Sequence, residues 1–90
     1  MKPEDFEKKR CNSGKNWQFK PKGFARLDLG KIARAVEEKG AEIELETSSL
    51  LILKIEGMQV DINSSGKIVA KTDDPERAEK TFSELVKTFK

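Results

Sequence analysis

The sequence offers few side chains that could perform catalysis. It contains no histidine and one cysteine, Cys11, so the commonest general base and the Cys-His and Ser-His nucleophilic arrangements are missing. Ser64 and Lys67 have the spacing of a serine-lysine nucleophile pair. That chemistry places the pair at a helix start, whereas here it spans a predicted hairpin turn. Gly14-Lys15 matches only a fragment of a phosphate-binding loop. We therefore predict a non-enzymatic protein without catalytic residues.

Acidic side chains recur at alternate positions in segment 41–47. Glu42, Glu44 and Glu46, with Asp61 on the same predicted sheet face, offer the oxygen ligands that divalent cations prefer. Strand residues two apart project in parallel and do not converge on one ion, so a solvated strand face is the simpler interpretation. We predict no metal site, no cofactor and no small-molecule ligand.

The net charge of +2 conceals an asymmetry along the chain. Residues 1–26 hold eight Lys or Arg against three acids, whereas residues 27–90 hold ten against thirteen. Aromatic residues are interleaved with the bases of the first segment, a pattern that nucleic acids favour. The alternative is that these aromatics pack under the sheet while the lysines provide solubility. The aromatics concerned are Phe6, Trp17, Phe19 and Phe24.

Ninety residues with 36% hydrophobic and 38% charged side chains predict one small globular domain. No apolar run approaches the roughly 20 residues that span a bilayer, and the first residues are too charged for a signal peptide. We therefore expect a cytoplasmic protein, and the single cysteine, Cys11, which leaves no internal disulfide possible, fits a reducing compartment. Abundant Lys and Glu with few Gln and Asn give a thermophile-like composition.

Hydrophobic periodicity predicts the elements of the second half. Segment 58–63 alternates apolar and polar residues, residues 64–66 form a turn, and 67–72 resumes the alternation, so we expect a hairpin. Asp74 and Pro75 favour the start of a helix that extends to about Phe89. Its apolar stripe is predicted to cover the core.

Earlier segments complete the fold. Asp28 is expected to cap a helix to about Lys39, followed by strands at 41–47, with Leu45 facing the core, and at 50–56. Asn16–Leu29 reads as an extended segment, and residues 1–15 as a flexible or loosely docked helical turn or tail. We predict an α+β domain over residues 16–90, of order β-α-β-β-β-β-α, with two helices packed on one face of a curved antiparallel sheet.

Three short stretches resemble one half of the TATA-box-binding protein core. Arg26-Leu27-Asp28-Leu29 before Ile32-Ala33 is similar to its first helix entry, Leu51–Ile55 to its third strand, and Ser65–Val69 to its last hairpin. In that family two such repeats form a saddle whose concave sheet grips the DNA minor groove. The resemblance covers Asn16 to Phe89 and implies the same half-saddle fold here.

The resemblance also implies a set of groove-facing residues. The large side chains that the family wedges between base steps correspond here to Ser48 and Asn63, and Asp61 would approach the groove. Since kinking DNA requires large apolar wedges, bending in the family's manner is not expected. The chain also holds one repeat, so a saddle would require two copies. The implied nucleic-acid-binding residues are Asn16, Gln18, Lys54, Lys67, Val69 and Lys71.

Two functional hypotheses follow. The first is a protein-interaction or self-association module, in which Leu50, Ile52 and Val69 form the apolar centre of an interface on the bare sheet face. A homodimer is one version of it, with the basic end of one chain against the acidic body of the other. The alternative is DNA or RNA binding through the same face and the basic N-terminal segment. Neither hypothesis involves a membrane.

Overall fold

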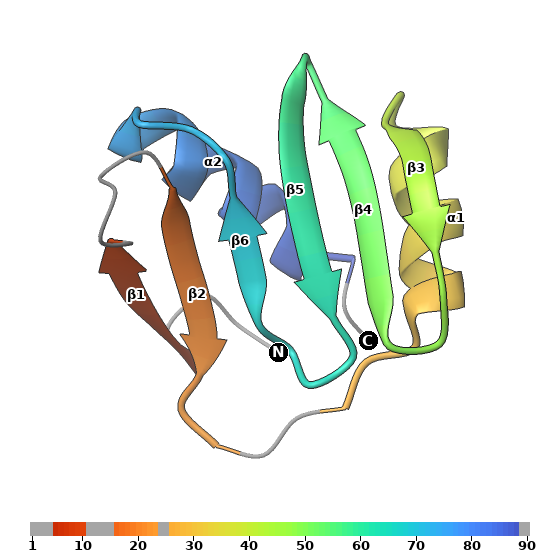
Figure 1. Cartoon of the computed structure of the whole chain (residues 1–90), viewed down its shortest axis with the longest axis horizontal. Coiled ribbons are helices and arrows are strands. Elements are labelled where there is room, and N and C mark those ends of the chain that lie inside the picture. Colours follow the sequence, from red (N-terminus) through yellow and green to blue (C-terminus); the bar gives the residue numbers. More distant parts are fainter. Residues whose placement is uncertain (1–4, 11–15, 24–25, 89–90) are drawn as a thin grey trace.

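The computed structural model describes residues 5–10, 16–23 and 26–88 of the chain. Their order along the chain is strand, strand, helix, four strands, helix (Figure 1). The elements are β1 (Phe6–Arg10), β2 (Trp17–Pro21), α1 (Leu29–Glu38), β3 (Glu42–Glu46), β4 (Leu50–Ile55), β5 (Met58–Asn63), β6 (Ile68–Ala70) and α2 (Pro75–Val86).

The strands form one open antiparallel sheet of six strands in the order β1-β2-β6-β5-β4-β3. Strands β3 to β6 follow one another through hairpins, and β2 pairs with β6 to bring the N-terminal part beside them. Both helices lie behind this sheet in Figure 1, α2 behind its β2 side and α1 behind its β3 side. The predicted α+β class with two helices and an antiparallel sheet is therefore confirmed.

Tight turns fix the register of the central hairpins. Glu56 and Gly57 both have positive φ, 51° and 82°, which suits the two-residue turn between β4 and β5. Gly66, at φ 99°, closes the next turn and donates its N–H to the Asn63 carbonyl at 2.9 Å. With these turns fixed, β5 buries Met58, Val60 and Ile62 and turns the residues between them away from the helices.

Capping residues set the start of both helices as the sequence predicts. The Asp28 carboxylate accepts from the Lys31 backbone N–H at 3.2 Å. Asp74 does the same for α2, where it accepts from two backbone N–H groups next to Pro75. These bonds satisfy N–H groups that have no partner within the helix. Helix α2 ends at Val86, and Phe89, predicted to continue its stripe, lies outside the described residues.

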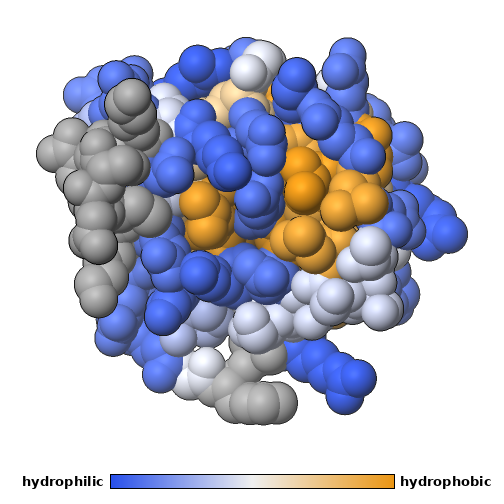
Figure 2. Space-filling view, viewed as in Figure 1, coloured by the Kyte–Doolittle hydropathy of each residue, from blue (hydrophilic) through white to orange (hydrophobic). Residues whose placement is uncertain are grey.

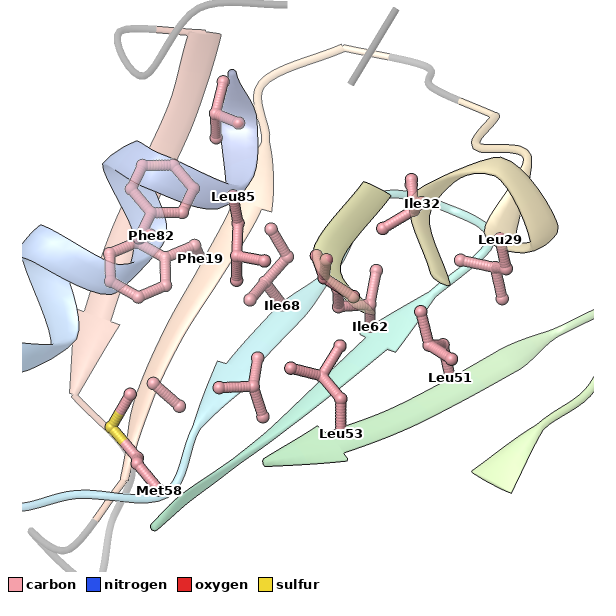
Figure 3. Packing of buried hydrophobic residues seen from close by; sticks show 14 of the residues in the cluster. Phe19, Leu29, Ile32, Leu51, Leu53, Met58, Ile62, Ile68, Phe82 and Leu85 are labelled. Atoms are coloured by element: carbon pink, nitrogen blue, oxygen red, sulfur yellow. The ribbon is translucent and has the colours of Figure 1, made fainter. Parts of the chain in front are cut away.

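The core fills the layer between the sheet and the helices (Figure 3). Phe82 of α2 stacks on Phe19 of β2 with ring centroids 4.0 Å apart, and it meets Phe6 of β1 edge-on at 5.0 Å. Trp17 is partly buried against the same core. The aromatics of the basic segment that are described therefore pack under the sheet, as the second interpretation of that segment expected.

Two local features differ from the expectations. Residues 6–10 form strand β1 and not a helical turn or tail, because Phe6 inserts beside Phe82 and β1 pairs with β2. Leu45 does not face the core. A β-bulge between Ile43 and Leu45 adds a residue, so Ile43 pairs with Leu53 but Leu45 pairs with Ile52.

Candidate interaction surface on the open sheet face

The sheet has one face that no element of the described residues covers, here called the open face. On β1, β2, β4, β5 and β6 its side chains alternate with buried neighbours, and on β3 the register with β4 places Glu42 and Leu45 on this face. Figure 2 looks onto this face and shows an orange apolar area over β4 and β3, a smaller apolar spot over β6, and hydrophilic residues between and around them.

Three residues form what we call the apolar patch: Leu45, Leu50 and Ile52. Leu45 is 43% exposed and lies directly opposite Ile52 in the β3–β4 register. Leu50 precedes Ile52 by two positions, so both side chains point to the same side of β4, and both are partly exposed. Sequence reasoning found Leu50 and Ile52 but missed Leu45, because strict alternation assigns it to the core.

Val69 shares the open face but is not continuous with the apolar patch. Asp61 of β5 pairs with Val69 on one side and with Ile52 on the other. This carboxylate therefore separates the two apolar areas. The predicted set Leu50, Ile52 and Val69 lies on one face, with its members in two groups.

Several charged groups of the open face are paired with each other. Lys54 Nζ lies 3.2 Å from Glu44 Oε1, and Lys71 Nζ lies 3.8 Å from Asp61 Oδ2. Asp61 also accepts a hydrogen bond from Gln59 Nε2 at 3.1 Å. These carboxylates offset the charge of two of the three lysines that the resemblance assigns to nucleic-acid binding.

The other residues of that set are spread over one half of the sheet. Gln18 lies opposite Val69 in the β2–β6 register, and Asn16 immediately precedes β2. Lys67 is partly buried directly before β6. The full set of six residues therefore extends across β2, β6 and β4. Asp61 of β5, which is paired with Lys71, lies between them.

The three glutamates of β3 do not act as one row. Glu42 is opposite Lys54 and Glu44 binds the same lysine, whereas Glu46 lies opposite the buried Leu51 beyond the bulge. Across residues 5–10, 16–23 and 26–88, no three Cys, Asp or Glu side chains are grouped closely enough to hold a metal ion. Ser64 and Lys67 flank the turn before β6, and no helix starts there.

Comparison with known proteins finds no matching family model and no significant match to a curated protein or to a solved structure. The fold is thus described by its own elements, an α+β domain with a six-stranded antiparallel sheet and two helices. Within the described part of the chain, neither helix has the length and apolar character that crossing a membrane requires.

Proposed function

We propose that this chain is a non-enzymatic protein-interaction module that binds its partner through the open face. The observation that carries the proposal is the apolar patch on a sheet face left uncovered by both helices. In a two-layer domain such a face leaves apolar area in water, and contiguous exposed apolar area with a polar surround is typical of interaction sites.

The charges around the apolar patch fit the same function. A protein interface has a desolvated apolar centre and a polar rim, and a rim charge that already has a partner costs less to approach than an isolated one. Lys54 with Glu44 and Lys71 with Asp61 supply such paired charges. The partner surface we expect is apolar at its centre and carries little net charge.

Nucleic-acid binding is the second candidate function, and the order of elements favours it. The TATA-box-binding protein resemblance implies the order strand, helix, four hairpin-connected strands, helix. The elements from β2 to α2 follow this order. Gln18, Val69 and Lys71 also lie on one sheet face. The ion pairs oppose this function, because phosphate contacts require cations that are free to neutralise them.

A binding experiment separates the two functions. The wild-type chain, Ile52→Lys and Ala35→Lys are each used to capture proteins from a lysate of the cells that produce this chain, and the captured proteins are compared. Ala35→Lys is the control, because it adds the same charge on α1. Each partner is then purified and its affinity measured by calorimetry. We expect Ile52→Lys to weaken binding by roughly 30-fold or more, and Ala35→Lys to leave it unchanged.

Duplex DNA and duplex RNA are titrated in parallel at low and high salt. Steeply salt-dependent binding that Lys54→Ala and Lys71→Ala weaken would replace the proposed function by the second candidate. A partner that binds both the Ile52→Lys and the wild-type chain equally would show that the open face is not the contact surface.

A further inference from the structure

The outline of the open face is comparable in size to one side of a typical specific protein interface. The molecule measures 30 × 29 × 19 Å, and the open face is seen along the shortest of these axes (Figure 1). Its outline therefore covers at most roughly 900 Å², against the roughly 800 Å² that each partner buries in a typical specific complex. On this measure, an interface of typical size would take up nearly the whole open face.

Among the side chains that the structure describes, the charges of the open face balance. Register and alternation place four lysines and four carboxylates among its described side chains. A balanced surface does not repel an identical surface, whereas a face with one dominant sign would resist its own copy. The positive residues are Lys20, Lys54, Lys67 and Lys71, and the negative residues are Glu7, Glu42, Glu44 and Asp61.

The β3 edge of the sheet is a less suitable contact surface than the open face. Edge strand β3 carries Glu42, Glu44 and Glu46, and its bulge interrupts the row of backbone groups that another strand would pair with. Charges and bulges on edge strands are the usual means by which proteins prevent edge-to-edge pairing. Two copies of β3 would also bring six carboxylates together. Association through the face avoids both costs.

We infer that the open face packs against the open face of a second copy of this chain. The apolar patches of the two copies lie against each other, and the balanced charges surround them. The result is a symmetric dimer of four layers in the order helices, sheet, sheet, helices, with the two sheets about 10 Å apart. This inference rests on the proposed function and specifies its partner.

The test is sedimentation equilibrium of the full chain over a wide concentration range, with Leu45→Lys as the principal variant. Leu45 is already 43% exposed, so a lysine there leaves the folded monomer intact but places a charge in the dimer centre. A symmetric dimer contains each substitution twice. If each substituted site lowers the dimerisation affinity roughly tenfold, the affinity of the variant homodimer falls roughly 100-fold. The affinity of the variant for a wild-type chain then falls only roughly tenfold.

Ala35→Lys is the matched control and is expected to dimerise like the wild type. Ile52→Ala, which adds no charge, is expected to weaken the dimer in the same direction. Hydroxyl-radical footprinting adds a second measurement, since Leu45 should be protected in concentrated solution and reactive in dilute solution.

A chain that stays monomeric at millimolar concentration overturns the inference, as does a dimer that Leu45→Lys and Ile52→Ala leave unchanged. These results are distinct from failure of the proposed function. A monomeric chain whose other protein partner is lost with Ile52→Lys would refute the dimer and support the interaction module. Salt-dependent duplex binding through Lys54 and Lys71 would refute both.

Discussion

Replacing Phe6 by alanine tests whether β1 belongs to the cooperative fold. Phe6 is only 7% exposed and packs edge-on against Phe82 with a ring separation of 5.0 Å. It is the anchor of a five-residue edge strand whose entry is held by the Lys22 N–H donating to the Asp5 carbonyl at 2.8 Å. If β1 is integral to the domain, removing this ring should destabilise the whole molecule.

The expected loss follows from the burial of the ring. Phe→Ala in a core costs about 3–5 kcal/mol, and an edge strand can close part of the cavity, so we expect about 3 kcal/mol for Phe6→Ala. A chain of 90 residues has a free energy of unfolding of roughly 5–13 kcal/mol. The variant should therefore remain folded, with a melting temperature lowered by roughly 12–24 °C.

Urea denaturation followed by circular dichroism and by Trp17 fluorescence measures the effect. Trp17 lies in β2 opposite Arg10 of β1, so its emission reports on the N-terminal side of the sheet, whereas circular dichroism reports on the whole fold. The matched control is Glu7→Ala, in the same strand at an exposed position, which should stay within about 0.5 kcal/mol of wild type.

The reasoning fails if Phe6→Ala unfolds within about 0.5 kcal/mol of wild type with an unchanged denaturant dependence. That result would mean that β1 detaches at little cost and that the cooperative domain begins at β2. A separate early transition in Trp17 fluorescence alone would lead to the same conclusion.

Three further changes test local features. Asp74→Ala removes the acceptor of two backbone N–H bonds at the start of α2 and should cost about 1 kcal/mol in urea denaturation. An added Cβ would meet no neighbouring atom within 4 Å at either Gly57 or Gly23, but only Gly57 has a positive φ, 82°. Gly57→Ala should therefore cost about 1–2 kcal/mol of stability, whereas Gly23→Ala should be nearly neutral. Deletion of Glu44 removes the bulge but keeps Leu45 opposite Ile52. The free energy of unfolding of this variant should therefore fall by no more than about 1 kcal/mol. A strongly destabilised variant would contradict the observed register.

Most of the fold could be predicted because its elements have strong local signals. Segment 58–63 alternates without interruption, and its buried residues are the expected ones. Asp28 and Asp74 occupy the capping positions that their neighbours require. In each case the information is contained within a few residues, so neither packing nor long-range pairing needs to be known in advance.

Strand β1 could not be predicted because its determinants are distant in the sequence. Segment 6–10 reads FEKKR, with one large apolar residue and no alternation strong enough to define a strand. Its conformation comes from pairing with β2 and from the contact of Phe6 with Phe82, 76 positions later. Tertiary context of this kind overrides weak local propensity, and a single sequence does not reveal it.

The candidate surface was predicted in part, and the bulge of β3 explains the remainder. Strict alternation would place Leu45 in the core and Glu46 on the open face. The extra residue reverses both positions, so Glu46 lies opposite buried Leu51, and a Cβ added at Gly30 would be 3.9 Å from its carboxylate. The acid thus lies beside the first turn of α1, where the helix dipole favours negative charge. The same irregularity that gives Glu46 a favourable position exposes Leu45 next to Ile52, and this enlarges the apolar area of the open face.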